Sequence, residues 1–329
     1  MKRSDFHLRR GILASACLSG LGALPALVRA AAPAWPSQPI RLIVPTAPGG
    51  PSDLVARTWT RAVGAEWNAI FVVDNKPGAS QIIGTQAVAS AAPDGYTLLQ
   101  AASSMATMPL VVDHLPFDVN KDFVAISQTH LTPLVVVVDP KLPIKSMADL
   151  IRYAKEHPGA LSFGHTGEGS SQQLATRLLA QKAGLPNLLE VPYKGSSQAH
   201  PDLIGGRLSV MIDPVSAVAP HIKSGALRAL AVTTSARVEA FPDLPTVAES
   251  GVPGYEVSSW GGVFAPAGTP KDVVNRVYQA LRKTLETPET KTKFSDWGLV
   301  AKTSTPAEFD SFVRSEVSRW RAVMLAPKT

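Results

Sequence analysis

Two glycine-rich loops carry the residues of this 329-residue chain whose types and spacing suit the binding of an anion. The first loop, residues 46–53 (Thr-Ala-Pro-Gly-Gly-Pro-Ser-Asp), follows the apolar run 40–44 and precedes a segment with helical spacing. The second loop, residues 164–171 (Gly-His-Thr-Gly-Glu-Gly-Ser-Ser), follows a short strand pattern and precedes a helix predicted over 172–182. Such a loop aims the N–H groups of a helix N-terminus at whatever lies above the strand. Each loop alone indicates either an anion site or only a turn.

The two loops together predict an anion site more strongly than either loop alone. They lie more than a hundred residues apart, so each belongs to its own strand–loop–helix module. If the modules face each other across a cleft, two sets of N–H groups and two helix dipoles converge on one anion, and each dipole contributes about 0.3–1 kcal/mol. The sequence therefore predicts a small-anion site between two parts of the fold.

The rest of the chain offers few patterns for catalysis, cofactors or metals. It contains no Gly-x-Ser-x-Gly, no His-Glu-x-x-His and no Gly-x-x-x-x-Gly-Lys-Ser/Thr. The first loop lacks the lysine and hydroxyl with which a P-loop meets terminal phosphates and magnesium. The seven histidines are scattered without a helical i, i+4 pair, which favours structural or surface roles over metal ligation. We expect neither a cofactor nor a metal, although carboxylates paired only in space stay open.

The elements that must position these loops follow an alternating pattern. Short β-branched runs alternate with amphipathic segments after an Ala/Pro-rich joint at 31–39. The runs that predict strands are 40–44, 71–73, 96–100, 123–126, 134–138, 161–163, 189–191, 208–212, 227–232 and 262–265. One helix is predicted after the cap residue Ser146, and two others are predicted to open at Thr269 to Asp272 and at Thr305 to Glu308. The alternation predicts an α/β fold with largely parallel sheets.

The formal net charge of +6 is unevenly placed along the chain. Residues 1–30 hold five basic residues and one acidic residue, a net of +4, which leaves +2 for the rest. The near-neutral remainder argues against a nucleic-acid partner. A basic start, an apolar run and a small-residue cleavage site at Ala30 predict that 1–30 is an export signal. Arg9 and Arg10 resemble a twin-arginine signal, with an ordinary secretory signal as the alternative.

The only cysteine, Cys17, lies inside this predicted signal. Cleavage near Ala30 would leave no disulfide, thiol nucleophile or Cys-based metal site. Lipidation of Cys17 is the alternative. No later segment is long and apolar enough to be predicted as a membrane span.

Eight motifs, in order over essentially the whole chain after the signal, resemble those of one family. They are Val44 to Arg57, Asn75 to Ala79, Ala92 to Leu98, Leu115 to Asp118, Val191 to Ser196, Leu227 to Val232, Leu244 to Glu249 and Ala265 to Lys271. The family is the extracytoplasmic substrate-binding receptors of tripartite tricarboxylate transporters, also called Bug proteins. The resemblance implies an α/β, two-lobed periplasmic binding protein fold (type II) with two crossover strands, which closes like a flytrap on a small carboxylated solute.

The resemblance also implies a domain organisation and partners. Lobe 1 would combine 37–133 with 234–329, lobe 2 would be 134–233, and strands near 134–138 and 227–232 would cross between them. The closed form would be recognised by the membrane subunits of the transporter. We expect a periplasmic monomer that is not an enzyme and does not bind nucleic acid.

Twelve residues are candidate ligand contacts. They are Thr46, Ala47, Gly49, Gly50, Asp53, Ser103, Ser104, Gly167, Gly169, Ser170, Ser171 and Asp213. The resemblance implies the loop residues and Asp213, while Ser103 and Ser104 follow the strand predicted at 96–100. Simpler roles stay open, because Asp53 suits the first turn of a helix and Ser170 suits a helix cap.

Two residues depart from the family pattern. Gln173 stands where the family often has a histidine, and Glu168 places a carboxylate between two loop glycines. A negative charge beside an anion site lowers affinity unless it faces solvent or meets a cation on the ligand. We expect Glu168 to face solvent, with a nitrogen-bearing ligand as the alternative.

Two further function classes remain open at this point. Asp53, Asp213 or a cleft histidine would serve an exported hydrolase or lyase acting on a small carboxylate. A receptor for a sensor kinase would need the same fold. Aromatic carboxylates, dicarboxylates and amino acids all fit the sequence as ligands.

Overall fold

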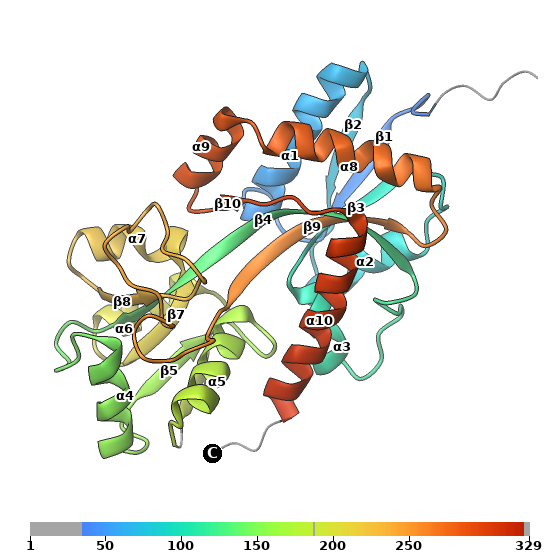
Figure 1. Cartoon of the computed structure of the whole chain (residues 1–329). Helices are drawn as coiled ribbons and strands as arrows, with labels where there is room; N and C mark the ends of the chain where they lie inside the picture. The colour runs from blue at the N-terminus through green and yellow to red at the C-terminus, as the bar shows by residue number, and fades with distance from the viewer. Residues whose placement is uncertain (1–34, 187, 326–329) are drawn as a thin grey trace, which may run out of the picture. The chain divides into compact units, whose positions relative to one another are not determined.

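The computed structural model describes residues 35–186 and 188–325 (Figure 1). The signal predicted over 1–30 lies outside these residues. Within the described part of the chain, no helix has the length and apolar character needed to cross a membrane.

Ten strands form one hydrogen-bonded sheet system in the described residues. Their bounds are β1 (Ile40–Val44), β2 (Phe71–Asn75), β3 (Thr97–Ala102), β4 (Phe123–Val138), β5 (Ser162–His165), β6 (Leu189–Pro192), β7 (Val210–Pro214), β8 (Arg228–Val232), β9 (Ser258–Pro266) and β10 (Val300–Ala301). Every run that predicted a strand overlaps one of them. The runs 123–126 and 134–138 proved to be the two ends of the single long strand β4.

The strand order is β2-β1-β3-β9-β4-β7-β5-β6, with β8 and β10 also paired to β4. The pairs β1–β2, β1–β3, β5–β6 and β5–β7 are parallel, whereas β9, β8, β7 and β10 each run antiparallel to β4. The expectation of largely parallel sheets was therefore wrong for the middle of the system. Helical crossovers give the parallel flanks, but β9 returns directly alongside β4 and β3.

Strand β4 changes partners along its length. Residues Phe123 to Pro133 pair with β9, and Leu134 to Val138 pair with β7 and β8. We call β1, β2, β3, β9 and β10 with the first part of β4 the first sheet, and β5 to β8 with its last part the second sheet. Figure 1 shows β4 and β9 side by side. The lobe boundaries predicted from the sequence stay a prediction.

Ten α-helices cover the sheets in the described residues. Their bounds are α1 (Pro51–Trp67), α2 (Ile82–Ala89), α3 (Ser104–Val111), α4 (Met147–Glu156), α5 (Ser171–Ala183), α6 (Ser196–Ile204), α7 (Val215–Lys223), α8 (Lys271–Leu285), α9 (Pro288–Asp296) and α10 (Pro306–Leu325). A short 3-10 helix, η1 (Ala79–Gln81), precedes α2. The predicted cap of α4 is confirmed, because Ser146 Oγ accepts a hydrogen bond of 3.1 Å from the Asp149 N–H.

Apolar packing holds the loops' parent elements in place. Trp59 of α1 is 1% exposed and packs in a core with Ile40 of β1 and Val277 of α8. A separate core in the second sheet contains Val135 and Met211. Full burial of one such side chain contributes about 1.5–3 kcal/mol. Strand β1, from which the first loop begins, contributes side chains to two cores and is therefore fixed from both faces.

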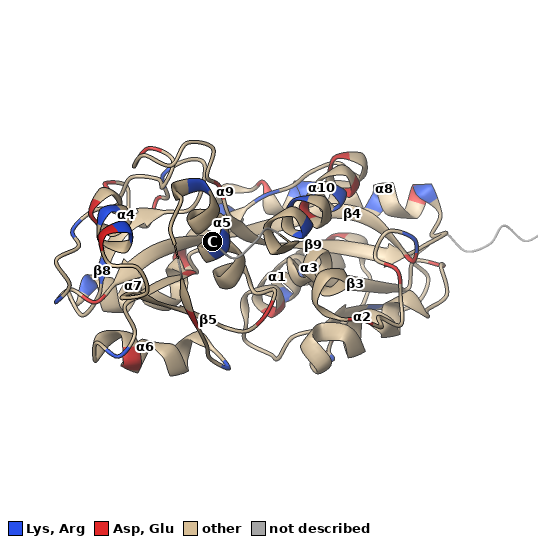
Figure 2. Cartoon of the chain, turned by 90° about the horizontal axis from the view of Figure 1, so that it is seen from below, with Lys and Arg blue, Asp and Glu red and all other residues tan. Residues whose placement is uncertain are grey.

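Acidic and basic residues are interspersed along the ribbon in the view of Figure 2. This distribution agrees with the small net charge expected beyond residue 30. Charged side chains of both signs lie on the described helices, and no continuous basic strip is seen in that view.

Candidate functional site

The first loop is braced by the buried carboxylate of Asp53, which is 2% exposed. Asp53 Oδ2 accepts hydrogen bonds from the Gly49 N–H at 2.9 Å and from Arg57 Nε at 3.0 Å. Asn75 Nδ2, at the end of β2, donates to Asp53 Oδ1 at 3.0 Å and to the Thr46 carbonyl at 3.1 Å. The loop is thus tied to α1 and to the neighbouring strand.

The charge of Asp53 is stabilised where it lies. Burial by itself raises the pKa of Asp53, but the hydrogen bonds from Arg57, the Gly49 N–H and Asn75, together with the charge of Arg57, lower the pKa below its usual value. Asp53 therefore acts as a first-turn acid that holds the loop. Contact between Asp53 and a ligand stays a prediction.

The other predicted residues of the first loop are accessible or unpaired. Thr46 Oγ1 is buried and has no hydrogen-bond partner among the described residues. Ala47 and Gly49 are exposed, and Gly50 is half-buried before the start of α1. A buried hydroxyl without a protein partner calls for a partner from outside the protein, such as a water molecule or a ligand.

The second loop is braced by the amide of Gln173, the residue that departs from the family pattern. Gln173 Oε1 accepts a hydrogen bond of 2.9 Å from the Gly169 N–H, and its Nε2 donates to Glu190 Oε2 at 3.0 Å. Ser170 Oγ caps α5 by accepting from the Gln173 N–H at 3.3 Å, which confirms its role as a cap. Ser171 is the first residue of α5. The Gly169 N–H, predicted to face a ligand, is thus engaged within the loop.

Glu190, which accepts a hydrogen bond from this amide, also forms an ion pair with Arg177. Arg177 donates to both oxygens of Glu190, at 2.7 and 2.8 Å. Burial raises the pKa of Glu190, but the hydrogen bonds and charge of Arg177 and the hydrogen bond from Gln173 outweigh it and lower the pKa. Glu168 is exposed, as expected from the sequence.

Asp213 is fully buried at the end of β7 and gathers three donors. Ser196 Oγ donates to Oδ1 at 2.6 Å, Gln172 Nε2 lies 3.3 Å from the same oxygen, and His200 Nε2 lies 2.8 Å from Oδ2. Serine and histidine both bond the carboxylate rather than each other, so they do not form a nucleophilic triad. The cluster connects β7, α6 and the start of α5. Contact of Asp213 with a ligand stays a prediction.

Sequence reasoning missed most of these partners. His200 was placed among the scattered histidines because it lies 13 residues from Asp213. Asn75 follows the predicted strand 71–73, and the parallel pairing of β1 with β2 brings it to the first loop. Gln173 carried a signal in the sequence as a departure from the family pattern, and Asn75 carried one as the first residue of a family motif.

Ser103 and Ser104 lie at the end of β3 and form one hydrogen bond each with another element. Ser103 Oγ lies 2.8 Å from Ser259 Oγ of β9, and Ser104 Oγ donates to Gln81 Oε1 at 2.7 Å. Both residues are half-buried. They join the end of β3 to the start of β9 and to η1.

The second loop touches α3. Gly169 has φ +71°, and a Cβ added to it would lie 2.9 Å from Val111 Cγ1 and 3.5 Å from Thr107 Oγ1. A side chain at this position would therefore be strained and would press on α3. The second loop is therefore packed against α3, the helix that follows β3 of the first sheet.

A cavity of about 790 Å³ adjoins the first loop. Gly49 and Leu54 line one part of it, and Val215 and Ser216 of α7, directly after β7, line another. Second-loop residues are not among those that line this cavity. The volume falls in the range of small-molecule sites.

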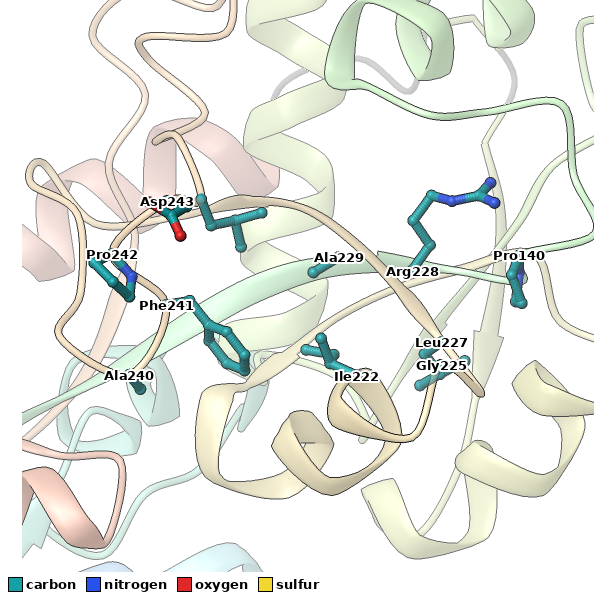
Figure 3. A pocket seen from close by; sticks show the side chains of 11 residues that line it. Pro140, Ile222, Gly225, Leu227, Arg228, Ala229, Ala240, Phe241, Pro242 and Asp243 are labelled. Carbon is teal, nitrogen blue, oxygen red and sulfur yellow. The ribbon is translucent and has the colours of Figure 1, made fainter.

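Another cavity, of about 580 Å³, lies beside β8 and α7 (Figure 3). Ile222, Phe241 and Asp243 are among its lining residues, as is Arg228, whose Nη1 donates to the Ile144 carbonyl at 2.8 Å. None of the twelve predicted contacts lines it. This pocket is therefore separate from the candidate site.

The first loop joins a strand end to a helix N-terminus and lies next to a cavity, an arrangement suited to binding a small solute. The family model described as tripartite tricarboxylate transporter family receptor (TctC) matches residues 55–327. The chain belongs to this family, whose members are periplasmic substrate-binding receptors and not enzymes. The fold is the two-lobed α/β periplasmic binding protein fold.

Solved structures of relatives agree in fold over nearly their whole length. A protein of R. palustris solved with adipate is 34% identical, with a TM-score of 0.76, and the match covers 88% of this chain and 97% of that one. The periplasmic binding protein BugD is 32% identical, with a TM-score of 0.71 and coverage of 88% and 97%. MatC from Rhodopseudomonas palustris, solved with malate, is 29% identical, with a TM-score of 0.72 and coverage of 88% and 99%.

Proposed function

We propose that this receptor captures a small carboxylate-bearing solute in the periplasm and presents it to the membrane subunits of a tripartite tricarboxylate-type transporter. The first loop carries the proposal. Its N–H groups lead into α1, and the buried Thr46 hydroxyl has no protein partner among the described residues. These groups suit a carboxylate, which accepts several hydrogen bonds and is favoured by a helix N-terminus.

Two further observations support the proposal. Adipate and malate, the ligands of two solved relatives, are both small carboxylates. The acids at the site are neutralised or enclosed, since Asp53 pairs with Arg57 and Asp213 is fully buried. A bound anion at the first loop is therefore not repelled by an uncompensated charge of Asp53.

In this proposal one carboxylate of the solute is held by the first loop and the start of α5. The twelve predicted contacts, including Ser103, Ser104 and Asp213, form or support that site. Lobe 1 (37–133 with 234–329) and lobe 2 (134–233) close on the solute. The monomer in its closed form is the species that the transporter recognises.

A thermal-shift screen of residues 31–329 against small mono- and dicarboxylates tests the proposal, with the matching amides as neutral controls. A solute at a hundredfold over its Kd adds about 2.7 kcal/mol of stability, which gives a clear shift. Shifts with carboxylates that disappear on amidation are the expected result. Thermal stability that no carboxylate changes would contradict the proposal.

Two variants locate the binding. Thr46→Val removes the unpaired hydroxyl of the first loop, and we expect it to weaken carboxylate binding about tenfold. Thr176→Val is the matched control, because Thr176 Oγ1 is also buried and unpaired, within α5. Equal affinities of the two variants would contradict a role for Thr46.

A further inference from the structure

Residues 79–81 adopt a backbone conformation that is costly for their types. Ala79, Ser80 and Gln81 have φ of +45°, +52° and +78°, three successive residues other than glycine in the left-handed region. This region is unfavourable for residues that carry a Cβ. Strain of this kind persists where surrounding contacts fix it, and it is concentrated at functional sites.

Gln81 is fixed by three hydrogen bonds. Its N–H donates to the Gly78 carbonyl at 2.9 Å, and its carbonyl accepts from Thr85 Oγ1 at 2.8 Å. Its side-chain Oε1 accepts from Ser104 Oγ at 2.7 Å. The strained backbone thus holds one side chain, the amide of Gln81, in a defined place.

That place is over the end of β1. Gln81 follows β2 and Ser104 follows β3, while β1 lies between these strands in the sheet. The hydrogen bond between the two side chains therefore spans the strand from which the first loop begins. Gly84 of α2 confirms the proximity, because a Cβ added to it would lie 2.8 Å from Pro45 Cβ.

Within the described part of the chain, the side-chain amide of Gln81 has unpaired hydrogen-bond donors at the end of β1. Ser104 occupies Gln81 Oε1, and Gln81 Nε2 has no hydrogen bond to any of the described residues. The side chain is half-buried, so it lies between the protein interior and solvent. A side-chain amide nitrogen carries two donors and no acceptor, and it suits an oxygen atom of a solute.

We propose that Gln81 determines specificity by donating from Nε2 to a second oxygen-bearing group of the solute, remote from the carboxylate held at the first loop. The receptor then selects bifunctional acids, such as dicarboxylates, over alkyl monocarboxylates of the same length. This inference rests on the proposed function, because it takes the first carboxylate as the anchor. Gln81 and Ser104 lie across the end of β1, the strand from which the first loop begins.

Binding constants for matched acids test the proposal on residues 31–329. Calorimetry compares linear dicarboxylates of four to eight carbons, their monoamides and the monocarboxylates of equal length. We expect wild-type protein to bind one dicarboxylate and its monoamide about tenfold or more tightly than the monocarboxylate. A wild type that binds the monocarboxylate equally well would overturn the inference.

Two glycine variants separate the amide from the strained backbone. Gln81→Gly removes the amide at a φ of +78° that glycine adopts freely, so the fold is retained. Ser80→Gly relieves the neighbouring φ of +52° and leaves the amide in place. We expect Gln81→Gly to lower the preference for the dicarboxylate about tenfold, and Ser80→Gly to keep the wild-type preference.

The remaining outcomes are distinguishable. If Gln81→Gly keeps the wild-type preference while binding carboxylates, Gln81 does not contact the solute and only this inference fails. If wild-type protein binds none of the acids, the proposed function fails with it. Gln81→Glu adds a charge at the same place, and we expect it to weaken dicarboxylate binding more than monocarboxylate binding; equal weakening would overturn the inference.

Discussion

The two loops are braced by different chemistry. In the first loop the carboxylate of Asp53 bonds the Gly49 N–H directly, and Arg57 neutralises it. In the second loop a neutral amide, Gln173, bonds the Gly169 N–H, and the charged pair of Glu190 with Arg177 stands one step further away. In each loop one backbone N–H is bonded within the protein, and the N-terminus of a helix follows the loop in the chain.

The difference shows what the acids in this site do. Asp53 positions the first loop directly and Glu190 supports the second through Gln173. An arginine compensates each carboxylate, so an anionic solute meets helix N-termini and hydroxyls instead of bare negative charge. Asp213 is the exception, because its three partners are a serine, a glutamine and a histidine. Substitutions at these acids test how far the two braces differ.

Removing Asp213 is expected to have the largest effect. Asp213→Ala leaves the donors of Ser196, Gln172 and His200 without their buried acceptor, and we expect a loss of about 3–5 kcal/mol in the free energy of unfolding. Chemical denaturation monitored by circular dichroism measures it. A loss below about 1 kcal/mol would show that the cluster does not support the second sheet.

Removing Asp53 is expected to cost less, because its partner Arg57 is half exposed. Asp53→Ala should lower the free energy of unfolding by about 2 kcal/mol and weaken carboxylate binding by freeing the first loop. Asp74→Ala is the matched control, since Asp74 pairs with Arg41 on the surface and should cost less than about 1 kcal/mol. Equal costs for the two variants would contradict the bracing role of Asp53.

The brace of the second loop should respond to acid. The pKa of Glu190 is lower in the folded protein than its usual value of 4.5, so its stabilising contribution is complete above that pH. The contribution is lost as the pH falls through the lowered pKa, because the unfolded chain then binds the proton more readily. Denaturation at several pH values should show a shallower acid loss for Glu190→Gln. Parallel pH profiles would contradict the assignment.

The smallest effect is expected at Glu168, which is exposed. Glu168→Gln should leave the Kd for a carboxylate within about threefold of wild type, because a solvated charge is screened. A loss of affinity beyond about tenfold would instead indicate that Glu168 meets a cationic group on the solute. Calorimetry on the same solute decides between the two outcomes.

The sequence predicted the elements better than their connections. β1 was placed at its observed bounds because an apolar run and a Pro/Gly turn delimit it, and the caps of α4 and α5 follow from local serine chemistry. The continuity of β4 and its switch of partners after Pro133 depend on pairing with distant strands. Local spacing contains no signal for such pairing, so the sheet was predicted as more parallel than it is.

The site was predicted at the level of loops but not of partners. The two loops, Ser103, Ser104 and the two buried acids were identified, yet His200, Asn75 and Gln81 were not assigned roles. Each of these three acts through a residue from another strand end or helix. Their roles arise from the order of strands in the sheet, which residue types alone do not reveal.

Hydrogen–deuterium exchange with and without a saturating carboxylate tests most directly whether both loops hold the solute. Amides of 46–54 and of 166–174 report on the two loops and on the starts of α1 and α5. We predict that binding protects both segments, while amides of α4, which lines neither cavity, are unchanged. Protection confined to one loop, under conditions where calorimetry shows full occupancy, would contradict the two-loop site.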